Sequence, residues 1–289
     1  MSRFKEECML GIDEAGRGPV LGPMIYACAI APIECDEELK GFGLADSKAL
    51  TEDERENLFS ILLQNYEMCS TCIHSISPVY ITQKMLNATK TSLNVISQNA
   101  AIDMIQKALD EGVNLKKVFV DTVGPPAVYQ EKLSKLFPNL EIKVESKADA
   151  KYPIVSAASI FAKVPRDNLL HNWPRSECGN ISDDMPLGSG YPGDPVTKKY
   201  LETCVDKIFG FPNIVRSSWS TATNLADQLC ISVKWEDDEE PVKKSRKRNS
   251  VAAGIDQDTE KKCLLNFKSL VETRLKIFTS SVNLKPVTL

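Results

Sequence analysis

The sequence has no uninterrupted apolar run of about 18 residues, the length that a transmembrane helix needs. Residues 1–7 end in two glutamates where a signal peptide requires apolar residues, so we expect an intracellular protein. Histidine is scarce: the chain has only His74 and His171, and its one CxxC pair, Cys69 and Cys72, lacks a second pair or a neighbouring histidine. A structural zinc site is therefore disfavoured. The nine cysteines are scattered, which favours reduced thiols.

Nucleotide-binding motifs are also missing. Gly16, Gly18 and Gly22 differ by one residue from the dinucleotide-binding pattern G-x-G-x-x-G. Pro19 and Pro23 interrupt the helix that this pattern needs. No segment carries the phosphate-binding pattern that ends in Gly-Lys-Ser or Gly-Lys-Thr. The sequence therefore argues against dinucleotide and nucleoside-triphosphate binding.

The composition is that of a globular protein. The chain of 289 residues is 43% hydrophobic and 26% charged, which suffices for one substantial core with a tail or a small second domain. Its net charge is −4, so it lacks the overall basicity of a simple nucleic-acid coat. Contact with a nucleic acid would therefore require a local basic patch, helped by metal cations.

Hydrophobic periodicity predicts an α/β domain with a mixed sheet. Thr51 and Glu54 form a capping-box pattern at the start of a helix. The continuous apolar run 118–120, followed by Asp121, is typical of a strand buried on both faces. Alternation of strands and helices along the chain indicates the α/β class. The other expected elements in this part of the chain are strands over 8–12, 24–30 and 140–144, a turn over 13–23, and helices over 92–109 and 126–136.

The segment 154–164 is apolar nearly all round, which predicts a helix buried at the centre of the domain. Pro165 follows directly, where we expect a kink or the end of the helix. A long loop is expected over 172–195. A further helix is expected over 197–209, closed by Gly210.

The character of the chain changes towards its C-terminus. An acidic run over 236–240 precedes a basic run over 243–248, and blocks of like charge resist packing. We therefore expect a folded domain over 1–225, a charged mobile linker over 226–258, and a helical segment over 259–289 that docks on the domain or on a partner. The basic run is either a nuclear import signal or simply a charged part of the linker.

Acidic side chains lie at three places where chemistry is expected. Asp13 and Glu14 follow the first apolar run, Asp121 ends a strand, and Asp149 precedes the apolar helix. Residues at strand ends of an α/β sheet can converge on one crevice, where four carboxylates repel one another unless cations bind. Mg²⁺ and Mn²⁺ prefer oxygen ligands, and two such ions roughly 3.5–4 Å apart recur in phosphodiester hydrolysis. Taken singly, an aspartate at a strand end, such as Asp121, is more often a turn or cap residue than a metal ligand. The adjacent pair Asp13 and Glu14 is as readily functional as not.

Six motifs occur in order over roughly residues 8–225. They are GIDEAGRGPVLGPM at 11–24, DSK at 46–48, VFVDTVG at 118–124, KADAKYPIVSAASIFAK at 147–163, GSGYP at 188–192 and GFP at 210–212. Together they closely resemble the ribonuclease HII family, in particular the catalytic subunits of eukaryotic type 2 ribonuclease H. The resemblance implies an RNase H-like α/β fold, with a central mixed sheet flanked by helices and a small helical C-terminal extension.

The resemblance also implies a metal-dependent endoribonuclease. It would hydrolyse the RNA strand of RNA–DNA hybrids and incise 5′ of single ribonucleotides in duplex DNA, leaving 3′-hydroxyl and 5′-phosphate ends. Asp13, Glu14, Asp121 and Asp149 match the family's catalytic, metal-binding carboxylates, with two divalent cations, Mg²⁺ or Mn²⁺, as cofactors. The chain would be the catalytic subunit of a heterotrimer with two non-catalytic subunits. It would act in the nucleus in ribonucleotide removal from DNA and in primer removal, with no membrane partner.

Substrate contacts follow from the same resemblance. Gly16, Arg17 and Gly18 match the loop that senses the ribonucleotide, and the 2′-hydroxyl that this loop would read is both donor and acceptor. Tyr191 matches the tyrosine that packs at the RNA–DNA junction; without the resemblance it would be a half-buried loop aromatic. Because neighbours on an extended strand point to opposite faces, we expect Asp13 between the two ions and Glu14 at the edge of the site.

Four basic residues are candidates for phosphate contacts, which carry most nucleic-acid affinity. Lys48 is the strongest candidate, followed by Lys147, Lys163 and Arg166. Each is nearly as readily a solvated surface cation. Because Pro165 is expected to disturb the chain, Arg166 is a weaker candidate, and Asp167 is expected to form a structural pair or a cap.

Two other classes of function compete with a ribonuclease. A non-catalytic nucleic-acid-binding or scaffold protein would have lost metal carboxylates, whereas all four are present. An integrase or junction resolvase of the same fold would lack the combination of Gly16, Arg17 and Gly18 with Tyr191, and would not depend on a 2′-hydroxyl.

Overall fold

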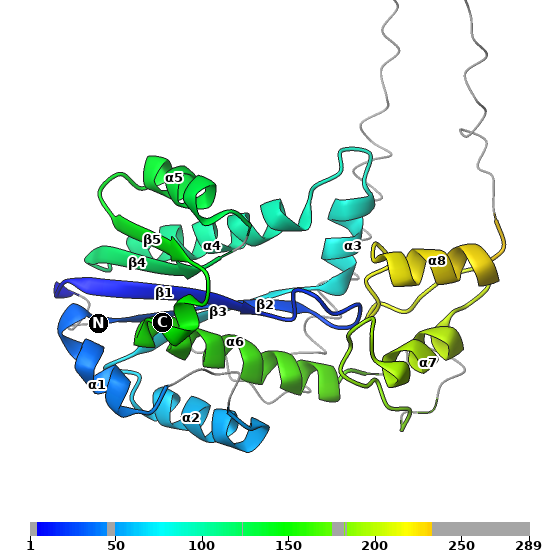
Figure 1. Cartoon of the computed structure of the whole chain (residues 1–289), viewed down its shortest axis with the longest axis horizontal. Helices are drawn as coiled ribbons and strands as arrows, with labels where there is room; N and C mark the ends of the chain where they lie inside the picture. Colours follow the sequence, from blue (N-terminus) through cyan, green and yellow to red (C-terminus); the bar gives the residue numbers. More distant parts are fainter. Residues whose placement is uncertain (1–4, 45–49, 123, 175–181, 183, 233–289) are drawn as a thin grey trace, which may run out of the picture. The chain divides into compact units, whose positions relative to one another are not determined.

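The computed structural model describes residues 5–44, 50–122, 124–174, 182 and 184–232. The five strands of this part form one mixed sheet in the order β3-β2-β1-β4-β5 (Figure 1). β1 is the central strand, antiparallel to β2 and parallel to β4. β3 is antiparallel to β2, and β5 is parallel to β4. The strands are β1 (Cys8–Ala15), β2 (Met24–Pro32), β3 (Ser70–Ile76), β4 (Leu115–Asp121) and β5 (Glu141–Glu145).

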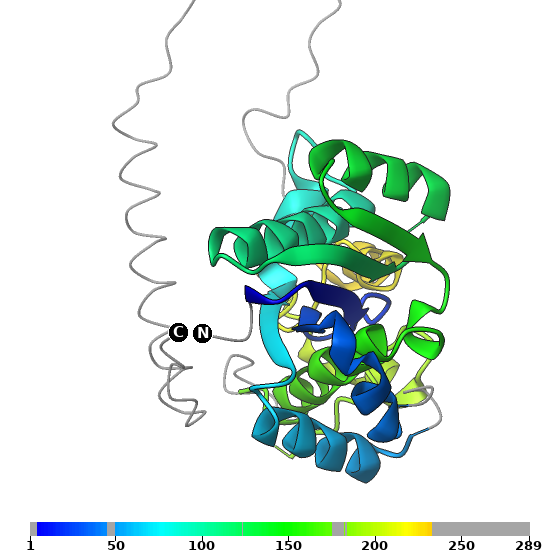
Figure 2. The same cartoon turned by 90° about the vertical axis from the view of Figure 1, so that its left-hand side faces the viewer.

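Helices cover both faces of the sheet, which confirms the expected α/β class (Figures 1 and 2). One face packs against α6, α1 and α2, and the other against α4, α5 and α3. None of the helices described is long and apolar enough to cross a membrane. The helical segments are η2 (Ile33–Cys35), α1 (Asp36–Gly41), α2 (Glu52–Gln64), α3 (Pro78–Leu86), α4 (Leu93–Asp110), α5 (Pro126–Leu136), η3 (Ala148–Ala150), α6 (Pro153–His171), α7 (Pro195–Cys204) and α8 (Ser220–Leu229).

Alternation along β1 divides its side chains between the two layers. Leu10 and Ile12 belong to the apolar cluster under α4 and α5, whereas Met9 and Ala15 belong to the cluster under α6. β2 is buried along its whole length. A strand with both faces buried cannot slip by one residue without moving every side chain to the wrong layer, so the register of the central strands is fixed.

Helix starts follow the sequence signals. Thr51 and Glu54 form the expected capping box: the Thr51 hydroxyl accepts from the Glu54 backbone N–H at 3.3 Å, and the Glu54 carboxylate accepts from the Thr51 backbone N–H at 2.7 Å. Ser92 caps α4 by accepting from the Val95 backbone N–H at 3.3 Å. These caps satisfy backbone donors that have no partner inside the helix.

Two expected helix ends are wrong. α6 does not end at Pro165 but continues to His171, and the alternative expected there, a kink at the proline, stays a prediction. Proline removes one intrahelical hydrogen bond, but residues on both sides of it, Val164 and Arg166, are buried, so packing holds the helix together. α7 ends at Cys204, before the expected limit of 209, because Asp206 starts a tight turn in which its carboxylate accepts backbone N–H groups from the next residues.

A third apolar cluster forms the helical extension. It joins α7 and α8 to the C-terminal part of α6 and to Val20 and Leu21, and Leu21 forms a β-bridge with Val215. The extension thereby contacts the chain between β1 and β2 (Figure 1). The boundary expected at residue 225 falls inside α8. The linker from residue 233 onward and the segment 259–289 lie outside the described residues.

Gly11, in the middle of β1, sets the distance between the sheet and α6. A Cβ atom at this position would lie 2.5 Å from the backbone carbon and oxygen of Ile154 and 2.7 Å from the backbone nitrogen of Val155. These distances are far below van der Waals contact, so only glycine lets the first turn of α6 approach β1 this closely.

We predict that Gly11→Ala lowers the free energy of unfolding by at least about 2 kcal/mol, because the new methyl group overlaps helix backbone rather than a movable side chain. Urea unfolding measures the change. Gly41→Ala is the matched control: nothing lies within 4 Å of its Cβ position. We expect its stability to stay within about 0.5 kcal/mol of the parent or to rise slightly. Equal effects of the two substitutions would contradict this account of the β1–α6 contact.

Candidate active site

One cavity opens at the ends of β1 and β4, beside η3. It has a volume of about 240 Å³, and its walls carry the four acidic side chains expected to act together. β1 and β4 run parallel with Ile12 opposite Val120, so Asp13 and Asp121 follow at the same level. The cavity is lined by Asp13, Glu14, Ala15, Gly16, Arg17, Gly18, Asp121, Asp149, Lys163 and Tyr191.

Asp13 lies on the α6 face of the sheet and is only 5% exposed. Burial raises the pKa of its carboxyl above the ordinary range, and the nearby Asp121 and Asp149 raise it further. Hydrogen bonds from the Ser159 hydroxyl and from the Glu14 backbone N–H, at 2.7 Å, oppose this increase. Asp13 is therefore a buried acid whose charge is poorly compensated by the protein alone.

Glu14 reaches the cavity from the opposite face. Burial and the charge of Asp13 raise its pKa, while the Arg17 guanidinium and the Tyr26 hydroxyl lower it. Tyr26 of β2 and Tyr129 of α5 are buried in the layer on this side. The expected separation of the two neighbouring acids thus follows from strand geometry. Both still line the same cavity, because it lies at the end of the strand.

Asp121 and Asp149 are linked through the turn that follows β5. Asp121 accepts a hydrogen bond from the backbone N–H of Ala148 at 3.0 Å, and Asp149 accepts one from Ala150 at 3.1 Å. Asp149 is 4% exposed. Lys147 starts the turn in the left-handed conformation, with φ of 56°, which lets the chain reverse immediately before Asp149.

These side chains suit hard cations. All four are carboxylates, and two of them have pKa values raised by burial and by one another, so a divalent cation would relieve their repulsion. As they stand, no three His, Cys, Asp or Glu side chains in the described part of the chain converge tightly enough to hold an ion. Binding would therefore require the carboxylates to turn towards a common point.

Hydrogen bonds from the helical extension fix the loop of Gly16, Arg17 and Gly18. Arg216, fully buried, donates hydrogen bonds from Nε to the Gly22 carbonyl at 2.9 Å, from Nη1 to the Arg17 carbonyl at 3.0 Å, and from Nη2 to the Gly16 carbonyl. Trp219 donates from Nε1 to the Gly18 carbonyl at 3.0 Å. The carbonyl oxygens of all three loop residues are thereby engaged, which fixes the backbone of the loop.

Arg17 is anchored in a second direction. Its guanidinium donates hydrogen bonds to the Asn94 side-chain oxygen and to the Ser97 hydroxyl, both on the first turns of α4. Gly16 is in the left-handed conformation, with φ of +76°, and a Cβ there would lie 2.7 Å from the Pro23 carbonyl. The loop therefore requires glycine at this position for both conformation and space.

Tyr191 lines the cavity beside Gly18 and is 50% exposed. Its ring would lie 3.2 Å from a Cβ at Gly18. The Gly190 carbonyl beside it accepts hydrogen bonds from the backbone N–H groups of Val20 and Leu21, at 2.8 and 3.2 Å. The turn over 188–192, here called the tyrosine turn, is thus hydrogen-bonded through its backbone to the residues that follow the glycine loop.

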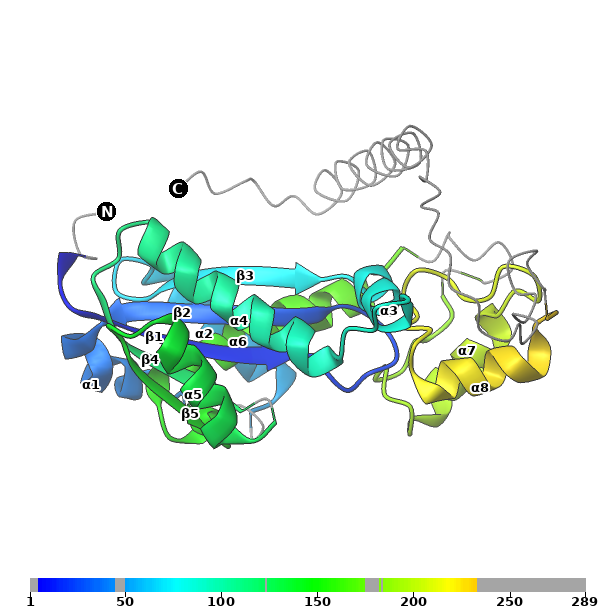
Figure 3. The same cartoon turned by 90° about the horizontal axis from the view of Figure 1, so that it is seen from above.

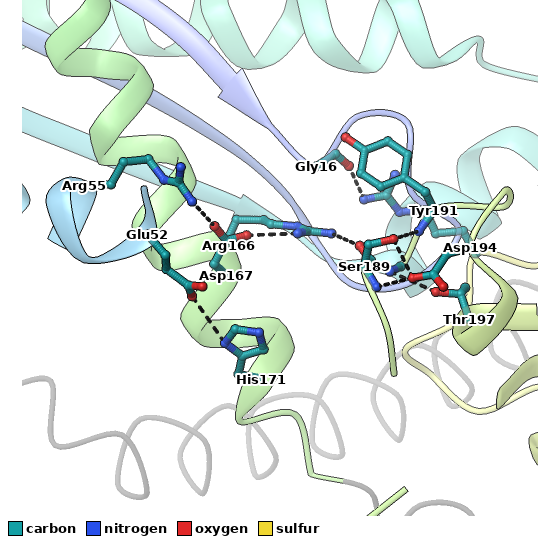
Figure 4. A network of polar contacts seen from close by, with 12 residues as sticks. Gly16, Glu52, Arg55, Arg166, Asp167, His171, Ser189, Tyr191, Asp194 and Thr197 are labelled. Carbon is teal, nitrogen blue, oxygen red and sulfur yellow. Dashed lines mark hydrogen bonds and ion pairs between the residues drawn. The ribbon is translucent and has the colours of Figure 1, made fainter. Parts of the chain in front are cut away.

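Further contacts hold the tyrosine turn in place (Figure 4). Arg166 donates from Nη2 to the Ser189 carbonyl at 3.2 Å and pairs with Asp167, which also faces Arg55 at 3.7 Å. The Asp194 carboxylate accepts from the Ser189 backbone N–H at 2.6 Å. Arg166 therefore has a structural role in this network, and its expected phosphate contact stays a prediction. Asp167 forms the structural pair predicted for it.

Twelve residues were candidates for the site, and the structure brings nine of them together in the cavity. Of the other three, Lys147 is exposed beside η3, Arg166 does not line the cavity, and Lys48 lies outside the described residues. Lys163, a weaker candidate, does line it. Sequence reasoning missed Arg216 and Trp219; the available signal was an arginine directly after the apolar pair 214–215, without an acidic neighbour to balance it.

Comparisons with known proteins agree with this geometry. Residues 10–222 match the family Ribonuclease HII. The chain is 50% identical over 244 residues to the A subunit of ribonuclease H2 from Caenorhabditis elegans, covering 83% of this chain and 82% of that protein. It is 47% identical over 234 residues to the corresponding human protein, covering 81% and 77%.

Solved structures of ribonucleases H have the same fold. The crystal structure of ribonuclease H2 from Pyrococcus horikoshii superimposes with a TM-score of 0.64 at 33% identity, covering 77% of this chain and 98% of that one. A ribonuclease HIII crystallised with Mn²⁺ shares the fold, with a TM-score of 0.59 at 15% identity over 78% of this chain and 70% of that one. The chain belongs to the ribonuclease HII family, whose members are endoribonucleases that cleave RNA in RNA–DNA hybrids and at single ribonucleotides embedded in DNA.

Proposed function

We propose that this chain incises duplex DNA on the 5′ side of a single embedded ribonucleotide, as well as the RNA strand of hybrids, leaving 3′-hydroxyl and 5′-phosphate ends. The observation that carries the proposal is one cavity that joins four carboxylates to a glycine loop and an exposed tyrosine. The carboxylates suit phosphodiester hydrolysis with two divalent cations, and the loop suits recognition of a sugar.

Asp13, Asp121 and Asp149 would hold Mg²⁺ or Mn²⁺ from the α6 side, with Asp13 between the two ions and Glu14 completing the site from the other side. Bound in this way, the ions would activate the attacking water and stabilise the leaving oxygen. The Mn²⁺-bound ribonuclease HIII of the same fold supports the choice of a hard divalent cation. Lys163, at the cavity wall, would contact the scissile phosphate, since a phosphate attracts cationic side chains.

Recognition of the ribonucleotide would depend on the loop of Gly16, Arg17 and Gly18. Arg216 and Trp219 hold its three carbonyl groups, so the loop presents one fixed backbone conformation to the substrate. A fixed backbone distinguishes one hydroxyl group better than a mobile one, because its polar groups cannot move to compensate for a missing partner. Tyr191, beside the loop, would stack on the nucleotide, and Lys147 and Lys48 would contact phosphates of the substrate.

We further propose that the chain is the catalytic subunit of a heterotrimer with two non-catalytic subunits and acts in the nucleus. Its relatives are named as one subunit of ribonuclease H2, which supports the assembly, and the basic run at 243–248 supports nuclear import. Purification from the native source tests the assembly: two further chains in constant proportion are expected, and a lone active chain would contradict it.

We predict that Asp149→Asn lowers incision of a duplex containing one ribonucleotide by at least about 10²-fold, because a ligand oxygen and its charge are lost while the shape is kept. The assay is gel analysis of the nicked strand with Mg²⁺. Asp103→Asn, an exposed site on α4, is the matched control and should retain activity within about twofold. Normal incision by a folded Asp149→Asn protein, with folding checked by its melting temperature, would exclude this active site.

A second prediction concerns stability without metal. Because burial and neighbouring acids raise the pKa of Asp13, the folded protein binds more protons than the unfolded chain, and its stability falls as pH rises from about 4 towards that raised pKa. Asp13→Asn removes this loss. In EDTA we expect the variant to be more stable than the parent by at least about 1 kcal/mol at pH 8, or about 2–4 °C in Tm.

At pH 5 the difference in stability between Asp13→Asn and the parent should largely disappear. At pH 8, saturating Mn²⁺ should make the parent the more stable protein, because only the parent keeps the full set of ligands. Thermal unfolding with EDTA or Mn²⁺ at the two pH values measures both effects. A variant less stable than the parent in EDTA at pH 8 would show that the protein itself compensates the charge of Asp13.

A further inference from the structure

A pair of thiols lies outside the active site, on neighbouring strands of the sheet. Cys28 of β2 and Cys72 of β3 are direct partners in the antiparallel register. Both side chains face the layer under α4: Cys28 is buried in that cluster, and Cys72 is partly buried against it. β3 is the edge strand of the sheet, so Cys72 is the more accessible of the two (Figure 3).

The spacing of such a pair suits a covalent bond. Residues directly opposite each other in an antiparallel ladder have Cα atoms about 4.5 or 5.5 Å apart, depending on the type of pair. A disulfide spans Cα separations of about 4.4–6.8 Å. Cys28 and Cys72 can therefore be joined without changing the register of β2 and β3.

The surroundings make Cys72 the nucleophile of the pair. The Lys107 ammonium of α4 lies 3.7 Å from its sulfur, and Glu111, one turn further, pairs with Lys107 at 3.8 Å. The hydrogen bond from Cys28 and the charge of Lys107 lower the pKa of Cys72 to about 6, despite the opposing effects of burial and Glu111. The same hydrogen bond, together with burial, raises the pKa of Cys28. A thiolate is the reactive form of cysteine, so oxidants should attack Cys72 first.

The CxxC pattern noted in the sequence is not the functional pair. Cys69 is buried in the cluster on the α6 face, whereas Cys72 packs against the opposite layer. Burial raises the pKa of Cys69 to about 12, so it has little thiolate character. The relevant pair is Cys28 with Cys72, which lie opposite each other on neighbouring strands. Their spacing along the sequence does not reveal this.

We propose that Cys72 and Cys28 form a reversible redox pair that accepts oxidation by hydroperoxides. The Cys72 thiolate attacks one oxygen of hydrogen peroxide, the O–O bond breaks, and hydroxide leaves, giving a sulfenic acid at Cys72. The Cys28 sulfur then attacks the Cys72 sulfur, the S–O bond breaks, and water leaves with the thiol proton. The hydroxide from the first step takes up the proton that Cys72 lost on ionisation. The two thiols thus lose two electrons, and the peroxide is reduced to two molecules of water.

Cys28, the thiol nearer the catalytic strand, protects Cys72 from further oxidation. Cys28 also pairs with Ile12 of β1, the residue before Asp13. Cys28 and Ile12 belong to the layer under α4, whereas Asp13 faces α6, so the disulfide forms on the opposite face of the sheet from Asp13. Capture by Cys28 stops the oxidation of Cys72 at the disulfide, which other thiols can reduce. It prevents the formation of sulfinic and sulfonic acids, which thiols cannot reduce.

The test is peptide mapping of the reduced full-length chain after treatment with hydrogen peroxide near pH 7.5. We expect a Cys28–Cys72 disulfide as the main product, removed by dithiothreitol. Cys28→Ala should instead accumulate sulfinic and sulfonic acid at Cys72. Cys230→Ser, a change at a partly buried thiol elsewhere, should still form the disulfide.

The role of the lysine is tested separately. Lys107→Met, at an exposed position that should not affect folding, is expected to slow the disappearance of the Cys72 thiol about threefold or more near pH 7. The proposal is overturned if Cys28 and Cys72 stay reduced while other thiols oxidise, if Cys72 pairs mainly with another cysteine, or if Lys107→Met leaves the rate unchanged.

Discussion

The close approach of α6 to the central strand is the contact on which the site depends. Gly11 lets the backbone at Ile154 and Val155 pack directly against β1. Ser159, further along α6, is thereby placed within hydrogen-bonding distance of Asp13, and η3, immediately before the helix, places Asp149 at the same cavity. A bulkier residue at position 11 would move the helix away and separate acids that derive from segments more than a hundred residues apart.

The carboxylates of the cavity repel one another. The fold buries Asp13 and Glu14 side by side, and their raised pKa values follow from that burial and from neighbouring carboxylates. The adjoining loop is treated differently: Arg216 and Trp219 hold all its carbonyl groups. The cavity thus combines acids of raised pKa with a rigid backbone, which is the arrangement that the proposed metal chemistry and sugar recognition require.

Much of the fold follows from local signals in the sequence. The capping box at Thr51 and the apolar run before Asp121 each predicted an element correctly, because local propensity and burial agree there. The end expected at Pro165 was wrong because tertiary burial outweighs one lost hydrogen bond. The four acids were candidates from their positions at strand ends, and the family motifs assigned them to one site. The support from Arg216 was missed, since it contacts residues about 200 positions away and the sequence does not show which carbonyl groups it reaches.

The central claim is that these four acids assemble around two cations. A crystal of the chain soaked in Mn²⁺, measured at the manganese absorption edge, tests it most directly. The account predicts two anomalous peaks roughly 3.5–4 Å apart in the cavity, with Asp13 contacting both and Glu14, Asp121 and Asp149 completing the coordination. Ordered Mn²⁺ elsewhere with none in the cavity, or ions there that do not contact Asp13, would contradict it.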